Sequence, residues 1–127
     1  MIVVDASAAL SALLNAGPAR RALADEQLHA PHLIDTEVAS GLRRNVQAKR
    51  LSAAAGWVAL DTFRRLGMTR YPGSALLDRV WDLRHNLSAY DACYVALAEF
   101  LACDLLTADA RMSRAPGIQC SVTVVPG

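Results

Sequence analysis

Four carboxylates in well-separated segments of the chain are the residues whose types could carry out chemistry: Asp5, Glu37, Asp91 and Asp109. Carboxylate oxygens without histidine or cysteine neighbours select hard cations such as Mg²⁺ or Mn²⁺. If the four converge, each pair of charges about 5 Å apart repels by roughly 3 kcal/mol at an effective dielectric constant near 20, so we expect a divalent cation among them. Such a cation can polarise a phosphodiester and activate water. The pattern therefore indicates metal-dependent phosphoryl transfer.

Each single carboxylate also has an ordinary structural explanation. Asp5 and Asp109 could be helix N-caps, and Asp91 could complete a capping box with Ser88. Acidic residues in a first helical turn also interact favourably with the helix dipole. For any one of them alone the capping interpretation is favoured. The four together weaken it, because a domain does not gather several repelling pairs without a positive group among them.

Short apolar segments alternate with helical patterns along the chain. We expect strands over residues 2–4, 27–30, 68–71, 104–107 and 121–125, and helices over 6–15, 20–25, 33–49, 52–67, 74–84, 88–102 and 109–114. This alternation predicts an α/β fold, a three-layer sandwich with a mostly parallel central sheet. Chemistry in such a sheet collects at the carboxyl ends of the strands, where helix N-termini also point. Asp5 and Asp109 follow two of these strands, so we expect them at that edge.

The helix expected over residues 33–49 carries two candidate acids. Ile34, Val38 and Leu42 lie one turn apart and form its apolar stripe. A helical wheel places Asp35 at least as close to this stripe as Glu37. Periodicity alone therefore does not choose between the two.

Length and composition predict one globular domain over residues 1–127. The chain has 127 residues, 54% hydrophobic and 20% charged, which excludes a disordered tail or linker. Its formal net charge of +1 argues against a polycation that binds nucleic acid over its whole surface. A nucleotide-cofactor enzyme is disfavoured because neither G-x-G-x-x-G nor a P-loop is present. A receiver-type phosphoacceptor is disfavoured because the one lysine, Lys49, lies mid-chain.

The N-terminal sequence and the cysteines predict a cytoplasmic protein. The start MIVVDASAAL has no basic region, and Asp5 interrupts its apolar run, unlike a signal peptide. No stretch reaches the roughly 18 apolar residues of a membrane span. The three cysteines have no C-x-x-C spacing, so we expect reduced thiols rather than a disulfide framework or a zinc site.

Other charged and aromatic residues carry weaker signals. Two basic clusters stand near predicted helix ends, where the helix dipole explains them as well as a phosphate contact would: Arg43, Arg44, Lys49 and Arg50, then Arg64, Arg65 and Arg70. For Trp57, Trp81 and Phe63 we favour the core or a dimer interface over base stacking.

The carboxylates and their neighbours together resemble a known family. VVDASA at residues 3–8, Glu37-Val38 before Gly41-Leu42, LSAYDACYVALAE at 87–99 and LLTADARM at 105–112 are similar to the motifs of the PIN domain, and more narrowly to the VapC toxins of bacterial type II toxin–antitoxin pairs. The resemblance covers essentially the whole chain. It implies a parallel-sheet α/β sandwich and an endoribonuclease dependent on Mg²⁺, with Mn²⁺ able to substitute.

The resemblance also assigns roles to individual residues. It implies that the metal ligands are Asp5, Glu37, Asp91 and Asp109, and so selects Glu37 over Asp35. We expect Asp5 and Asp91 to hold the main ion directly, and Glu37 and Asp109 to orient water or a second ion. Ser7 and Thr107 occupy the hydroxyl positions of the family beside the site, where they would support the ligands.

The partners implied by the resemblance are an RNA substrate, a second copy of the chain in a homodimer, and a small antitoxin of the VapB type. The antitoxin would lay a helix on the domain and push a basic or polar side chain into the acidic site. DNA would be reached only indirectly through the antitoxin, and no membrane is involved. The alternative is a non-catalytic RNA- or protein-binding domain on the same fold, against which the intact set of acids argues.

Overall fold

A five-stranded parallel sheet forms the centre of the computed structural model, which describes residues 1–127. The strands lie in the order β3-β2-β1-β4-β5, and every neighbouring pair is parallel. Their bounds are β1 Ile2–Val4, β2 Leu28–Pro31, β3 Met68–Tyr71, β4 Asp104–Thr107 and β5 Val122–Val124. The expected mostly parallel sheet is therefore confirmed, and it contains no antiparallel strand.

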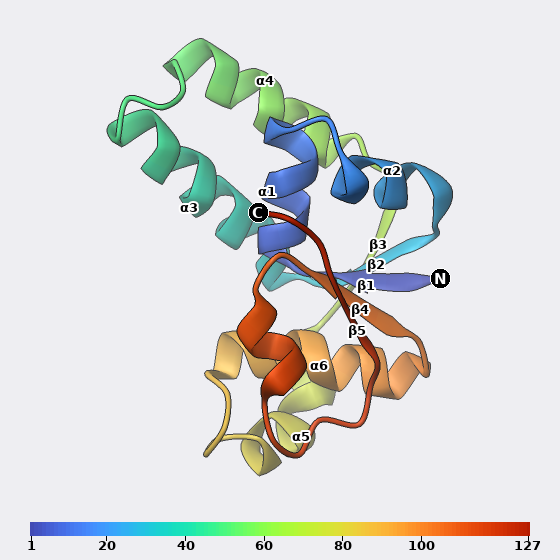
Figure 1. The fold of residues 1–127 in the computed structure, drawn as a ribbon. Helices are drawn as coiled ribbons and strands as arrows, with labels where there is room; N and C mark the ends of the chain where they lie inside the picture. Colours follow the sequence, from blue (N-terminus) through green and yellow to red (C-terminus); the bar gives the residue numbers. More distant parts are fainter.

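Helices cover both faces of this sheet and give the expected three layers (Figure 1). One layer contains α1 Ala6–Leu14, α2 Pro18–Asp25, α3 Leu33–Gln47 and α4 Ala53–Arg64. The other contains α5 Leu77–Asp82 and α6 Ala89–Leu101, with the 3₁₀ helix η2 Ala110–Arg114 beside them and η1 Gly73–Leu76 preceding α5. None of the helices combines the length and the apolar character needed to cross a bilayer.

The core explains why these short strands hold together. Val3 and Val4 of β1 and Leu105 of β4 are fully buried, as expected for strands covered on both faces. On one face, α6 buries a nearly continuous apolar surface against the sheet, as its composition predicts. Ser88 caps the start of this helix by accepting a hydrogen bond from the Asp91 backbone N–H.

Two expectations about local structure needed correction. The segment expected as one helix over residues 74–84 divides into η1 and α5, and the segment over 109–114 is a 3₁₀ helix.

Among the aromatic residues, Phe63 is buried, but Trp57 and Trp81 are 57% and 67% exposed. A core position was therefore wrong for both tryptophans. Each instead lies under an arginine, Trp57 under Arg64 and Trp81 under Arg84.

The strand order places a topological switch at the centre of the sheet. From β1 the chain proceeds outward through β2 and β3, then returns to the other side of β1 with β4 and β5. Crevices outside the carboxyl ends of the strands form where the winding direction reverses. That point lies between the ends of β1 and β4, directly before Asp5 and Asp109.

Candidate active site

A cavity of about 510 Å³ lies at this switch point, and all four predicted carboxylates line it. Asp5 stands at the start of α1, Glu37 on α3, Asp91 in the first turn of α6, and Asp109 directly before η2. Ser7, Arg44 and Tyr94 are among the other residues that line it. We refer to this space as the acidic cavity. Four elements from different parts of the chain thus bring their acids to one place.

Asp5 is the most buried of the four acids, with 5% of its surface exposed. Its Oδ1 accepts hydrogen bonds from the Ala8 backbone N–H at 2.9 Å and from the Ser7 hydroxyl at 2.7 Å, while its Oδ2 accepts one from the Thr107 hydroxyl. Asp5 is therefore the N-cap of α1, as the capping interpretation holds, and also a member of the cavity. Burial raises the pKa of Asp5, and the hydrogen bonds oppose this rise.

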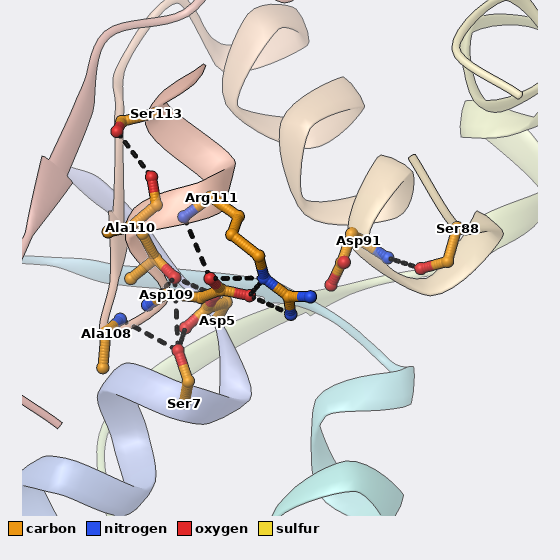
Figure 2. Close-up of polar contacts among 10 residues, drawn as sticks. Asp5, Ser7, Ser88, Asp91, Ala108, Asp109, Ala110, Arg111 and Ser113 are labelled. Atoms are coloured by element: carbon orange, nitrogen blue, oxygen red, sulfur yellow. Dashed lines mark hydrogen bonds and ion pairs between the residues drawn. The ribbon is translucent and has the colours of Figure 1, made fainter. Parts of the chain in front are cut away.

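Ser7 and Thr107 connect the ends of β1 and β4 around Asp5 (Figure 2 shows the Ser7 part of this network). The Ala108 backbone N–H donates to the Ser7 hydroxyl at 2.9 Å, and the Asp109 backbone N–H donates to the Thr107 hydroxyl at 3.0 Å. Each hydroxyl thus donates to Asp5 and accepts from the segment that carries Asp109. This arrangement fixes the orientation of the Asp5 carboxylate.

Glu37 points into the cavity while its rival Asp35 points elsewhere. Asp35 forms an ion pair at 2.8 Å with Arg70 of β3, outside the acidic cavity. The Glu37 Oε1 accepts a hydrogen bond at 2.6 Å from the buried Tyr94 hydroxyl of α6. Burial raises the pKa of Glu37, and repulsion by Asp91 and Asp5 adds to this effect.

The Asp91 carboxylate has the fewest hydrogen bonds of the four acids. Its backbone N–H donates to the Ser88 hydroxyl at 3.1 Å, but no backbone N–H donates to its carboxylate, so the reciprocal half of a capping box does not form (Figure 2). Burial raises the pKa of Asp91, as does the negative charge of Asp109. A role in helix capping alone therefore does not account for this side chain.

Asp109 differs from the other three because it has a cationic partner. Two nitrogens of the Arg111 guanidinium contact its two carboxylate oxygens, with the shortest distance, 2.7 Å, from Nη2 to Oδ2. This contact is the main reason that the pKa of Asp109 is lowered. Asp109 also caps η2 by accepting from the Arg111 backbone N–H at 3.0 Å.

The acidic cavity gathers four carboxylates, of which Asp109 alone forms an ion pair. In this conformation no three of the His, Cys, Asp and Glu side chains converge closely enough to form a finished metal site. The donors are nevertheless all carboxylate oxygens, and the pKa values of three acids are raised by burial and mutual repulsion. Such a set fits a hard divalent cation in its chemistry, and a bound cation would relieve the repulsion.

The basic residues divide into those that face the cavity and those paired elsewhere. Arg44 lines the cavity and lowers the pKa of Glu37. Arg64 and Arg65 form ion pairs with Asp61, so these members of the second basic cluster are already engaged. Sequence reasoning missed Tyr94 and Arg111. The spacing of Tyr94, three residues after Asp91 on one helix, is a signal that could have found the tyrosine.

Comparison with known proteins identifies relatives over nearly the full length. The family described as "PIN domain" matches residues 2–118. A VapC ribonuclease of Mycobacterium bovis and ribonuclease VapC9 of Mycobacterium tuberculosis are each 63% identical over 126 residues, covering 99% of both chains. Ribonuclease VapC1 of M. tuberculosis is 44% identical, covering 97% of this chain and 96% of the relative.

Solved structures with lower sequence identity share the fold. The crystal structure of M. tuberculosis VapC20, described as a toxin that cleaves the sarcin-ricin loop, superposes with a TM-score of 0.66 at 21% identity and covers 94% of this chain and 97% of its own. A toxin–antitoxin complex from Klebsiella pneumoniae gives a TM-score of 0.70 at 20% identity and covers 100% of both chains. These likenesses support the architecture described above.

Proposed function

Because this chain belongs to the PIN domain family and, within it, to the VapC ribonucleases, we propose that it is a Mg²⁺-dependent endoribonuclease toxin that hydrolyses phosphodiester bonds of RNA. The observation that carries this proposal is the convergence of four acids from four elements on one cavity. Burial and repulsion raise the pKa values of three of them, and a positive ion among them would offset the repulsion. A binding domain without catalysis does not require several partly buried carboxylates that repel one another.

The residues of the cavity divide the work according to their surroundings. Asp5, fixed by Ser7 and Thr107, and Asp91, without backbone donors, would hold the cation. Asp109 would complete the site. When bound, the Mg²⁺ or Mn²⁺ ion supplies Lewis-acid polarisation of the phosphodiester and neutralises developing charge.

Glu37 is the residue best placed to handle the attacking water. Tyr94 fixes its Oε1, which leaves Oε2 to orient the water and to take its proton. A raised pKa suits this role, because a base with a pKa nearer neutrality accepts a proton more readily. As the water oxygen bonds to phosphorus, the bond from phosphorus to the ribose oxygen in line with it breaks, and the leaving oxygen takes a proton from solvent.

RNA cleavage with and without metal tests the proposal. Cellular RNA incubated with the protein and Mn²⁺ is expected to give defined fragments, and EDTA is expected to abolish them. Asp5→Ala and Asp91→Asn should each reduce cleavage by more than about a hundredfold. Asp104→Asn is the matched control, because this exposed carboxylate lies at the opposite end of β4. Full activity in both cavity variants, or no metal-dependent product from any RNA, would favour the non-catalytic alternative.

An apolar groove next to the acidic cavity supports the proposed antitoxin partner. The groove has a volume of about 460 Å³, lies between α1, α2 and α4, and ten of its twelve lining residues are hydrophobic. Its members include Leu13 and Leu14 at the C-terminal end of α1, whereas Ser7 in the first turn and Leu10 in the middle of the same helix line the acidic cavity. A partner helix laid in the groove beside α1 could therefore extend a basic side chain to the acids.

We also propose that the protein forms a homodimer in the cytoplasm. Large apolar side chains remain exposed on α5, where Leu77 and Trp81 are 58% and 67% exposed, as is typical of surfaces that contact another chain. The three cysteines are free thiols, as expected in a reducing compartment. Light scattering should give twice the chain mass of 13.6 kDa, and a monomer at working concentrations would contradict the dimer.

A further inference from the structure

The ion pair between Asp109 and Arg111 sits at the mouth of the acidic cavity. Arg111 Nε lies 3.0 Å from Oδ1 and 3.3 Å from Oδ2 of Asp109, and Nη2 lies 2.7 Å from Oδ2. The two residues are only two positions apart, so the arginine side chain folds back over the acid. Its side chain is nevertheless 83% exposed, whereas that of Asp109 is 29% exposed. The guanidinium is therefore open to water and ions, whereas the Asp109 carboxylate is partly buried.

The same guanidinium also faces a second acid of the site. Figure 2 shows it between Asp109, which directly precedes η2, and Asp91 of α6. Its charge attracts Asp91 as well as Asp109. Arg44, which also lines the cavity, lowers the pKa of Glu37 but forms no ion pair with it. Arg111 thus places a positive charge where a metal ligated by Asp91 and Asp109 would place its own.

We propose that Arg111 is the internal counter-ion of the site, which holds Asp109 in the metal-free protein and must be displaced before Asp109 can serve the bound cation. This inference rests on the proposed function, because it assumes that the four acids bind a divalent ion. It assigns Arg111 as a positioning residue that competes with the metal. An arginine two residues after the last acid would thereby set how tightly the cation binds.

Displacement of the guanidinium is physically easy because the Arg111 side chain is exposed. An ion pair surrounded by water is weak, since solvent screens the charges and both side chains lose freedom on pairing. A cation held by Asp5 and Asp91 would repel the guanidinium and attract Asp109 in its place. The freed guanidinium stays at the mouth of the cavity, where its fork of N–H donors suits a phosphate of the incoming RNA.

A purely structural role for the Arg111 side chain is less consistent with these contacts. Asp109 already caps η2 through the Arg111 backbone N–H, and this bond does not need the guanidinium. The guanidinium forms hydrogen bonds only with Asp109, and the side chain is 83% exposed. Removal of the guanidinium should therefore leave the fold intact and change the behaviour of the acids.

Titration of Mn²⁺ into the metal-free full-length protein by calorimetry tests the inference. Arg111→Gln should bind Mn²⁺ about three- to fivefold more tightly than the wild type, because the competing charge is gone. Arg111→Lys keeps the charge without the fork and should fall between them. Arg114→Gln is the matched control, since Arg114 is an exposed arginine of the same 3₁₀ helix that influences Asp109 only from a distance. It should change the affinity by less than about twofold.

The kinetics of RNA cleavage provide a second test of the inference. At saturating Mn²⁺, Arg111→Gln should raise the KM for RNA and flatten its dependence on salt, because one phosphate contact is lost. Unchanged or weaker Mn²⁺ binding by Arg111→Gln would overturn the counter-ion role, as would equal tightening in Arg114→Gln. An unchanged KM would overturn the phosphate contact. If the wild type itself binds no Mn²⁺, the proposed function fails and the inference fails with it.

Discussion

At the scale of single residues, two of the carboxylates that cap helices also line the acidic cavity. Asp5 caps α1 and Asp109 caps η2, yet both line the acidic cavity. Asp91 is the exception, because no backbone N–H donates to its carboxylate. An N-cap pattern in the sequence is thus no evidence against a metal ligand. What excludes a carboxylate as a ligand is a side chain that points away from the other acids, as that of Asp35 does in its ion pair with Arg70.

Tyr94 is expected to support catalysis through Glu37. Tyr94→Phe removes the hydroxyl that donates to Oε1 of Glu37 at 2.6 Å and leaves this half-buried acceptor without its partner. We expect Mn²⁺ affinity or kcat to fall about tenfold, the usual consequence of losing a group that orients a ligand. Tyr90→Phe removes a more exposed hydroxyl from the same cavity and should have little effect. Equal cleavage rates in wild type and Tyr94→Phe would show that Tyr94 does not support catalysis.

At the scale of elements, the sequence predicts the helix and strand boundaries that depend on residues close together in the chain. The capping serines at 52 and 88, the apolar strands and the acids that follow them locate most helix starts and strand ends within a few residues. The choice between Asp35 and Glu37 could not be made from helical periodicity, because it depends on Arg70 of β3 and Tyr94 of α6. The exposure of Trp57 and Trp81 also depends on tertiary packing. Contacts between distant segments are the part that one sequence leaves open.

The apolar groove between α1, α2 and α4 predicts a variant that separates antitoxin binding from catalysis. Val58 lines this groove and is 63% exposed. Val58→Asp should weaken capture of the co-encoded antitoxin by more than about tenfold, because the charge loses its water when the partner helix binds. RNA cleavage by the free protein should not change. Phe100→Asp, which changes an exposed apolar residue of α6 outside the groove, is the control. Undiminished antitoxin capture by Val58→Asp would exclude the groove.

At the scale of the whole molecule, ionised acids in the acidic cavity oppose folding, because burial and mutual repulsion raise the pKa values of three of them. The net charge of +1 does not reveal this, since it sums the acids of the cavity with the rest of the surface. If divalent cations bind the acids as proposed, the protein surface carries more positive charge than the formal count. A near-neutral chain is therefore compatible with an RNA substrate.

The dependence of stability on pH exposes this cost. Burial and Asp109 raise the pKa of Asp91 in the folded protein, so ionisation of this group opposes folding as the pH rises through the interval between its unfolded and folded values. Metal-free Asp91→Asn should therefore melt a few degrees higher than wild type at neutral pH, with the gap closing as the pH falls below the usual range for aspartate. Thermal denaturation of both proteins across this range measures the gap. A variant less stable than wild type at neutral pH would show that the Asp91 carboxylate stabilises the fold.

The most direct test of the central claim is calorimetric titration of Mn²⁺ into the metal-free wild type and Asp91→Asn, with Asp104→Asn as control. We expect saturable binding by the wild type and the control, and binding more than about tenfold weaker by Asp91→Asn, because the two amide-for-acid changes differ only in whether they touch the acidic cavity. Absence of Mn²⁺ binding by the wild type, or equal affinity in Asp91→Asn, would contradict a metal site built from these four carboxylates.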